Sequence, residues 1–341
     1  MKSLRVLHLT HPSLVPPDTL EGLDERARHR IKTDWDVATT LRALGHEVLS
    51  VGVEDELRPI RSAVRTFKPH VVFNLVEGFD GLPALDHHVV SYLELLGVPY
   101  TGCNPRGLVL ARDKALSKKL LHYHRIKTPG FKALPKGRKV NLPRTLQLPV
   151  IVKSLMEESS IGISQASVVD TTAKLEERVA FIHESVDTDA IAEEFIDGRE
   201  IYVALLGNER VTVMPPWELT FENMPEGSVS IATERVKHDP DYQRRRGIGL
   251  EPARNLPEGV EALLARTSKR IYKILELDGY ARIDYRLGND GKIYFLEANP
   301  NPEIAASEEF AAAAEESGLD YPQLLQRILG LALRRKSRMN G

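Results

Sequence analysis

The chain has 341 residues, of which 42% are apolar and 28% are charged, as is typical of a soluble globular protein with two or three packed units. Its formal net charge of −2 gives no general reason to expect a nucleic acid or an anionic membrane as a partner. Cys103 is the only cysteine, which excludes an intrachain disulfide and zinc sites built on several thiolates.

The N-terminal segment shows no targeting signal. Residues 1–10 contain a short strand-like run without a long apolar core or a small-residue cleavage site. No apolar stretch reaches the length that spans a membrane, so we expect a cytoplasmic protein. The basic cluster of Arg334, Arg335, Lys336 and Arg338 is most simply a frayed, solvated tail.

The first part of the chain alternates strands with helices. We predict strands over 4–9, 47–53 and 70–75 and helices over 34–44, 57–67 and 87–96. In the first helix, Val37, Leu41 and Leu44 recur at helical spacing, and Gly45 is a fitting stop. Because strand–helix–strand alternation is typical of parallel sheets, we expect a parallel sheet with helices on its faces.

The middle of the chain mixes short elements with loops. We predict a helix over 113–124, a loop-rich segment over 126–149, a strand over 149–153, a small-residue loop over 157–163, a helix over 172–183 and strands over 190–195 and 200–206. Residues 215–257 are rich in charge, Pro and Gly, and we predict a long irregular stretch there. A loop of that length inside a compact domain is usually functional or mobile.

The last part is predicted to contain a helix over 259–277, strands over 280–285 and 294–300, and a final helix over 321–335. The segment Gly288-Asn289-Asp290-Gly291 between the two strands is typical of a turn, so the strands should pair as a hairpin.

This hairpin has one polar face. Arg282 and Asp284 alternate on the first strand, and Glu297 and Asn299 alternate on the second. Oxygen ligands in such an arrangement suit Mg²⁺, which commonly binds one or two carboxylates and takes its other ligands from nucleotide phosphates and water. A solvated hairpin face is the alternative interpretation.

Two isolated lysines also indicate a phosphate site. Lys153 ends an apolar strand, where a charge needs a partner or a ligand. Lys114 follows Asp113 at a helix start, although cations are favoured at helix C-termini. A bound polyphosphate would explain both placements, and two surface lysines are the alternative. The loop Ser159-Ser160-Ile161-Gly162 could wrap phosphate, but without a GxxxxGK[ST] pattern the chain is not a P-loop NTPase.

The segment Glu193-Glu194-Phe195-Ile196-Asp197-Gly198-Arg199-Glu200 reads as a strand end and a turn. Such a turn can offer backbone N–H and C=O groups to an adenine edge, and a carboxylate such as Glu200 can accept from ribose hydroxyls. Taken alone, such a segment is more often a plain hairpin.

The order of these elements resembles the ATP-grasp superfamily, and more narrowly the D-alanine–D-alanine ligase family. The resemblance rests on a strand-end Lys, a Ser/Gly loop, an E-E-x-I-x-G-x-E turn, an R-x-D strand and an E-x-N strand, in that sequence. Phe73-Asn74-Leu75, Asp80-Gly81, the segment 93–102, Asp113-Lys114 and the segment 149–153 support it. It covers most of residues 70–335.

The resemblance implies an α/β fold of the ATP-grasp type in three parts. These would be an N-terminal Rossmann-like substrate domain over 1–105, a small central ATP-grasp subdomain over 106–190 and a C-terminal ATP-grasp subdomain with the metal site over 191–341. The two ATP-grasp subdomains would enclose ATP. The implied activity is ATP-dependent ligation of a small-molecule carboxylate and an amine through an acyl phosphate. A homodimer is also considered, because related ligases are commonly dimers.

The resemblance also assigns residues to ATP. Lys114 and Lys153 would hold the phosphates, and the loop with Ser159, Ser160 and Gly162 would close over them. Adenine would contact Glu193 and the backbone of Glu194 and Ile196, and the ribose would contact Glu200. Asp284, Glu297 and Asn299 would bind two Mg²⁺ ions, for which Mn²⁺ could substitute. Arg282 would stabilise the acyl phosphate and the tetrahedral intermediate, and Lys237 would reach the γ-phosphate.

The chain departs from the family pattern on the substrate side. Leu9-Thr10-His11-Pro12-Ser13 replaces the usual Gly-Gly-x-Ser-x-Glu. Asp34 is the nearest stand-in for the acid that holds the first substrate's ammonium group, with a plain helix N-cap as the alternative. Glu77-Gly78 replaces the usual His-Gly, and Glu158 replaces a glycine of the serine loop.

The region after Asn299 departs furthest. Where the family has Pro-Gly and then serines that hold the second substrate's carboxylate, this chain has Pro302-Glu303 and then Ser307-Glu308. Glutamates there would repel that carboxylate. We therefore hypothesise an acceptor other than D-alanine, cationic or without a free carboxylate, unless Glu303 and Glu308 point to solvent.

Two other functions remain open at this point. An ATP-grasp kinase would release the phosphorylated substrate itself, and a non-catalytic nucleotide-binding protein would carry out no reaction. The intact set of Lys153, Arg282, Asp284, Glu297 and Asn299 argues against decay of an active site.

Overall fold

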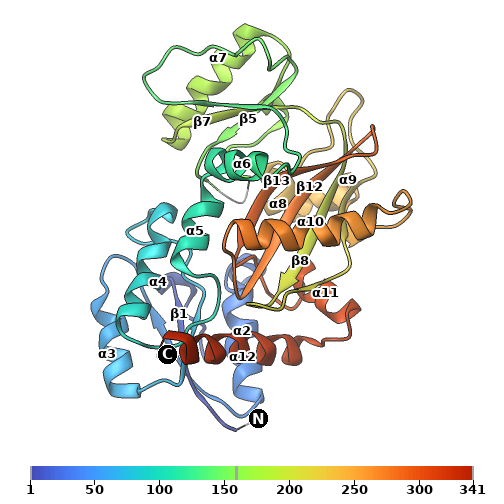
Figure 1. Cartoon of the computed structure of the whole chain (residues 1–341). Helices are drawn as coiled ribbons and strands as arrows, with labels where there is room; N and C mark the ends of the chain where they lie inside the picture. Colours follow the sequence, from blue (N-terminus) through green and yellow to red (C-terminus); the bar gives the residue numbers. More distant parts are fainter. Residues whose placement is uncertain (1, 158–159, 340–341) are drawn as a thin grey trace.

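The computed structural model describes residues 2–157 and 160–339, with the side chains of 336–339 excepted, and arranges their strands in three sheets (Figure 1). The first sheet has the order β2-β1-β3, from β1 (Arg5–Thr10), β2 (Glu47–Gly52) and β3 (Val71–Asn74). Both of its pairings are parallel, as the alternation of strands and helices predicted.

Helices cover both faces of the first sheet because its strands alternate their side chains between the faces. Leu7 and Leu9 pack with α3 (Arg58–Phe67) and α4 (Asp86–Leu95). Val6 and Phe73 pack on the other face with α2 (Lys32–Ala43) and α12 (Tyr321–Met339). The last helix of the chain therefore returns to the first sheet (Figure 1). The short helix α1 (Glu25–Arg30) precedes α2.

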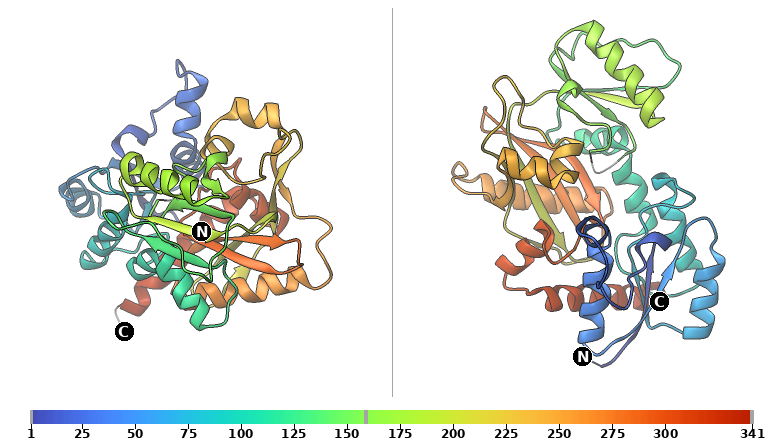
Figure 2. Two further views of the ribbon diagram at one scale, coloured as in Figure 1. Left: turned by 90° about the horizontal axis from the view of Figure 1, so that it is seen from above. Right: turned by 180° about the vertical axis from the view of Figure 1, so that it is seen from behind.

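Two helices, α5 (Pro105–Arg112) and α6 (Lys114–Tyr123), lead from the first sheet to the second. The second sheet is antiparallel, with the order β4-β7-β5-β6, from β4 (Phe131–Leu134), β5 (Val150–Ser154), β6 (Val168–Val169) and β7 (Ala190–Glu194). Its core includes Leu175 and Val179 of α7 (Thr172–Phe181). Figure 2 shows this sheet at the end of the molecule opposite the first sheet.

The pairing of β7 bears on the expected domain limits. Ile151 of β5 pairs with Glu193 of β7, so the second sheet extends to Glu194, past the boundary expected at residue 190. Residues 190–194 therefore share a sheet with the central part of the chain.

The third sheet is the largest. Its order is β11-β10-β8-β12-β13, with β9 on β8, from β8 (Gly198–Leu206), β9 (Thr212–Val213), β10 (Trp217–Phe221), β11 (Ile248–Pro252), β12 (Tyr280–Gly288) and β13 (Ile293–Pro300). Helix α10 (Val260–Ile274) packs on it through Leu264 and Ile271, which share a core with Val203 and Ile283. Helix α11 (Glu309–Glu316) follows β13.

The prediction of an irregular stretch over 215–257 was wrong. This segment contains β10, β11, α8 (Glu234–His238) and α9 (Pro240–Arg246). Leu219 and Val236 belong to a small core of their own, against which Phe221 and Ile248 pack. The elements are five to seven residues long, too short to show a clear period, and the charged residues between them hide the pattern.

The prediction of a frayed basic tail was also wrong for Arg335. Helix α12 continues to Met339, and Arg335 is only 9% exposed. Its guanidinium donates to the carbonyls of Tyr100 and Gly102, at 3.2 and 2.7 Å, and lies 2.8 Å from the Asp278 carboxylate. These partners come from distant parts of the chain. Within the described residues, no helix is both long and apolar enough to cross a membrane.

Candidate active site

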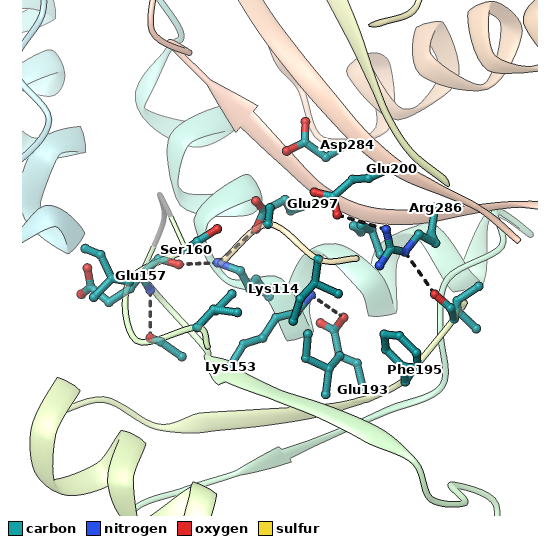
Figure 3. Close-up of a pocket in the computed structure, with 18 of the residues that line it drawn as sticks. Lys114, Lys153, Glu157, Ser160, Glu193, Phe195, Glu200, Asp284, Arg286 and Glu297 are labelled. Carbon is teal, nitrogen blue, oxygen red and sulfur yellow. Dashed lines mark hydrogen bonds and ion pairs between the residues drawn. The ribbon is translucent and has the colours of Figure 1, made fainter. Parts of the chain in front are cut away.

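A pocket of about 750 Å³, counting its solvent-open part, lies between the second and third sheets (Figure 3). Most of the residues that the sequence assigned to ATP and metal line it: Lys114, Lys153, Ser160, Glu193, Glu194, Ile196, Glu200, Lys237, Asp284 and Glu297. Arg282 and Asn299 pair with each other on the same hairpin as Asp284, and they and Gly162 lie outside the lining. Ser159 and Glu158 fall outside the described residues.

The hairpin of β12 and β13 was predicted correctly, and its polar face is in register. Asp284 pairs with Glu297, and Arg282 pairs with Asn299. The guanidinium of Arg282 donates to both Asp284 oxygens, at 2.7 and 2.9 Å, and the Asn299 amide donates to Asp284 at 2.9 Å. Asp284 is 2% exposed, so this face is not a solvated one.

A β-bulge shapes the same hairpin. Asp284 pairs with Glu297 while Tyr285 pairs with Phe295, which leaves Leu296 as the extra residue on β13. The carbonyl of Leu296 instead accepts a hydrogen bond from the Lys118 ammonium group. The bulge thus directs one backbone carbonyl away from the ladder and toward α6.

The two carboxylates of this face have opposite pKa shifts. Burial raises the pKa of Asp284, and Arg282 only partly offsets it. Burial also acts to raise the pKa of Glu297, but Lys114, Lys237 and Lys153 outweigh it, and that pKa lies well below its ordinary value. An ionised Glu297 beside Asp284 is a suitable oxygen donor set for Mg²⁺.

Lysines surround Glu297 from three elements. Lys114 begins α6, where Asp113 caps the helix by accepting from the N–H groups of Ala115 and Leu116. Its ammonium donates to the Glu157 carbonyl at 2.5 Å and lies 3.4 Å from Glu297 (Figure 3). Lys153 on β5 and Lys237 on α8 also line the pocket. The three cations converge on one region, as a polyphosphate site requires.

Glu193 has partners that the sequence did not indicate. Its carboxylate is fully buried, 3.2 Å from the Lys153 ammonium and 3.1 Å from that of Lys118. Burial acts to raise the pKa of Glu193, but the two lysines outweigh it and hold the pKa below its ordinary value. Burial acts to lower the pKa of Lys153, but Glu193 and Glu297 outweigh it and raise that pKa. Burial lowers the pKa of Lys118, against the pull of Glu193. The adenine contact expected of Glu193 would therefore have to share this carboxylate with two cations.

Arg286 links three segments at the end of the pocket that contains Ile196 and Glu200. Its guanidinium lies 3.3 Å from the Glu200 carboxylate and donates to the carbonyls of Ile196 and Ser230, at 3.1 and 2.8 Å. Glu200 also accepts from the Tyr202 hydroxyl at 2.9 Å. Arg286 thus joins the turn expected to meet adenine, the carboxylate expected to meet ribose and the segment that leads to α8.

The serine loop contacts the segment that contains Lys237. The Gly162 amide donates to the Glu234 carboxylate at 3.0 Å, and Gln165 exchanges hydrogen bonds with the backbone of Val229. Ser160 has a left-handed backbone, with φ of 60°, as does Gly162, with φ of 72°. Residues of both segments, among them Ser160 and Lys237, line the pocket.

The glutamates after β13 are neither free nor directed simply to solvent. Lys32 at the start of α2 pairs with Glu308 and lies 3.3 Å from Glu303, which also accepts from the Thr33 hydroxyl at 3.0 Å. Glu308 is followed by Glu309, which pairs with Arg282. Ser307 itself is exposed. An ion-pair cluster of Lys32, Glu303 and Glu308 therefore borders the hairpin of β12 and β13.

The two remaining substrate candidates lie near the first sheet. Asp34 is 4% exposed, and its carboxylate lies 3.1 Å from Nε2 of His8, so its partner in the structure is a histidine. The alternative of a helix N-cap was wrong, because Ile31 is the N-cap of α2 and Asp34 lies within its first turn. Glu77 is exposed and follows β3.

Among the charged residues in or beside the site, sequence reasoning missed Lys32, Lys118, Arg286 and Glu309. Each makes its main contacts with residues far away in the sequence, and Lys118 and Leu296 are 178 positions apart. A lysine at a helical spacing or a glutamate at a helix start is indistinguishable from a surface residue without those partners. For Arg286, the one available signal was a charge directly after the strand predicted over 280–285.

Comparison with known proteins identifies relatives for most of the chain. A family model described as "D-ala D-ala ligase C-terminus" matches residues 115–330. The D-alanine–D-alanine ligase of Moorella thermoacetica is 31% identical over 317 residues, covering 89% of this chain and 94% of that protein. An uncharacterized protein of Sinorhizobium fredii is 33% identical over 310 residues, covering 88% of this chain and 87% of that protein.

Solved structures share the fold. The D-alanine–D-alanine ligase from Bacillus anthracis complexed with ATP superposes with a TM-score of 0.76 at 21% identity, covering 100% of both chains. The D-alanine–D-alanine ligase from Coxiella burnetii gives a TM-score of 0.74 at 19% identity, covering 100% of this chain and 97% of that one.

Proposed function

Since the chain belongs to the D-alanine–D-alanine ligase family of ATP-grasp enzymes, we propose that it uses ATP to join a carboxylate to an amine, with an acceptor other than D-alanine. The observation that supports the chemistry best is the convergence of Lys114, Lys153 and Lys237 on the pocket that Asp284 and Glu297 also line.

The proposed reaction replaces a poor leaving group on the carboxylate with a better one, phosphate. A carboxylate is a poor acyl donor because oxide leaves poorly. Attack of its oxygen on the γ-phosphorus of ATP gives an acyl phosphate and ADP. The amine then attacks the acyl carbon, and inorganic phosphate leaves as the amide bond forms. Both steps place growing negative charge on oxygen, which fixed cations stabilise.

Different residues of this chain would bind the phosphates, stabilise the developing charge and exclude water. Lys114, Lys153 and Lys237 bind and orient the phosphates. Arg282, which donates to Asp284, stabilises the negative charge that develops on the acyl group. Asp284, Glu297 and Asn299 would hold Mg²⁺, which supplies Lewis-acid stabilisation of phosphoryl oxygens. The segments that meet through Gly162 and Glu234 cover the site and protect the acyl phosphate from water.

The ion-pair cluster of Lys32, Glu303 and Glu308 supports the proposed change of acceptor. Its two carboxylates outnumber its one ammonium group, so its net charge is negative. An acceptor carboxylate would have to compete with both glutamates for Lys32. An ammonium group or a neutral amide would meet no such competition.

A screen of acceptors tests the proposal. The purified protein is incubated with ATP, Mg²⁺ and pairs of amino acids, amino-acid amides and diamines, while ADP and inorganic phosphate are both measured. We expect equal amounts of ADP and phosphate, with acceptors that lack a carboxylate or bear an added cation preferred over D-alanine. Efficient D-alanyl-D-alanine formation would refute the acceptor part. ADP without phosphate would indicate a kinase instead of a ligase.

A further inference from the structure

Lys118 is a fully buried lysine that cannot touch a ligand in the pocket. It lies on α6, one turn after Lys114, and is 0% exposed. Its ammonium group lies 3.1 Å from the Glu193 carboxylate on β7, donates to the Leu296 carbonyl on β13 and lies 5.3 Å from the Phe295 ring centroid. A buried charge of this kind requires partners, and these come from both sheets that form the pocket.

The charges around Lys118 bear directly on phosphate binding. Glu193 lies between Lys118 and Lys153, with one carboxylate oxygen toward each. With all three groups ionised, the triad has a net charge of +1, and Lys153 lines the pocket. Without Lys118, Glu193 would neutralise Lys153, and the net charge beside the phosphates would fall to zero.

The backbone gives Lys118 a second point of contact. Leu296 is the extra residue of the β-bulge, and its carbonyl is turned out of the ladder toward the Lys118 ammonium. Glu297 is the next residue along the strand. The same side chain therefore fixes the bulge from which the proposed metal ligand extends.

We propose that Lys118 is a positioning residue of the nucleotide site: it neutralises Glu193 so that the charge of Lys153 is available to phosphate, and it holds the bulge before Glu297. The inference rests on the proposed function, because it assumes that the pocket binds a nucleotide. It assigns a role to a side chain that has no contact with that nucleotide.

The test compares a charged and an uncharged ligand in the same magnesium-containing buffer. Calorimetric titrations measure the affinities of ADP and adenosine for the wild type and for Lys118→Met. We expect ADP affinity to fall about tenfold, the scale of one charge-assisted hydrogen bond, because Glu193 would then compete with the phosphates for Lys153. Adenosine has no phosphate, so its affinity should stay nearly constant. A fall that is the same for both ligands would contradict the charge argument, as would an unchanged ADP affinity.

Glu193→Gln tests the same triad, and its expected effect on ADP affinity is opposite to that of Lys118→Met. Removing the carboxylate leaves Lys153 without a competing anion, so ADP affinity relative to adenosine should rise. In the double variant Lys118→Met/Glu193→Gln, that relative affinity should return to the wild-type value or above it. This pair of variants tests the inference even if Lys118→Met alone fails to fold. A double variant as weak as Lys118→Met would overturn the inference.

Arg112→Met is the matched control. Arg112 is also a buried cation paired with a buried carboxylate, Asp86, but neither residue lines the pocket. This variant should lose stability without changing the ratio of ADP to adenosine affinity. If the wild type binds no ADP, the proposed function itself fails. If the wild type binds ADP and the variants of Lys118 and Glu193 bind it equally well, only the present inference is overturned.

Discussion

The proposed nucleotide side and the proposed acceptor side of the site are built differently. On the nucleotide side, Glu193, Asp284 and Lys118 are at most 2% exposed and lie on strands or a helix that cross-link two sheets. On the acceptor side, the side chains of Lys32, Glu303 and Glu308 are 21%, 46% and 20% exposed. Two of these three follow the end of β13 in a loop.

This difference is consistent with what each side would recognise under the proposed function. The phosphates of ATP are the same for every member of a family, so their cations can be fixed in regular elements that packing holds rigid. A choice of acceptor can be altered in loops after the strand ends without disturbing the sheets. The predictions below test whether the two sides are separable in practice.

The largest effect is expected from Glu297→Gln, on the nucleotide side. The change removes a charge that lies opposite Asp284 and among three lysines. We expect the rate of ADP formation to fall about 10²–10³-fold, as when one transition-state contact is removed. Glu218→Gln is the control, because Glu218 also pairs with a cation, Arg199, in the third sheet but does not line the pocket. A Glu297→Gln protein with normal turnover would contradict the proposed metal site.

A smaller and more selective effect is expected from Lys32→Met, on the acceptor side. It leaves Glu303 and Glu308 without their shared cation. The KM of any acceptor that bears a carboxylate should rise about tenfold, the scale of one lost charge pair, while the KM of ATP stays constant. Initial rates at saturating ATP measure the first quantity, and rates at saturating acceptor measure the second. An equal rise in both would show that the two sides are not separable.

The smallest effect is a pH dependence of stability that originates at Glu308. Burial raises the pKa of its carboxyl to about 6, Glu303 adds to the shift, and Lys32 opposes it. Between the ordinary value of 4.5 and about 6, the folded protein binds this proton more tightly than the unfolded chain does. The free energy of unfolding should therefore fall as the pH rises through that window.

Urea unfolding of the wild type and of Glu308→Gln measures this contribution, because all other titrating groups are shared by the two proteins. The wild type should lose stability relative to the variant between pH 4.5 and pH 6.5. A difference between the two proteins that is constant across this range would show that Glu308 titrates normally.

The parts of the site predicted from sequence are those set by short-range patterns. The hairpin followed from a period of two residues and a Gly-rich turn, and both act within about twenty positions of the chain. The positions of Lys153 and Glu200 followed from charges at strand ends. The order of these elements allowed the family to be recognised, although no single motif specified it.

The parts that escaped prediction depend on contacts between distant segments. Lys118 is one of three lysines on α6, and nothing in the helix itself distinguishes it from Lys119. Its burial results from the docking of two sheets against that helix. The same applies to Arg335, whose partners Tyr100 and Asp278 lie on two other segments, and to Lys32, whose effect on Glu303 depends on how α2 lies against the end of β13.

The return of α12 to the first sheet sets the timing of folding during synthesis. Leu324, Leu325, Ile328 and Leu329 complete the apolar cluster around Val6 and Phe73. A ribosome makes roughly 5–20 residues per second, so this face of the sheet waits on the order of ten seconds or more for its cover. The most N-terminal strands are therefore among the last to be fully enclosed, and a nascent chain of this protein exposes the apolar side chains of Val6 and Phe73 until α12 has been made.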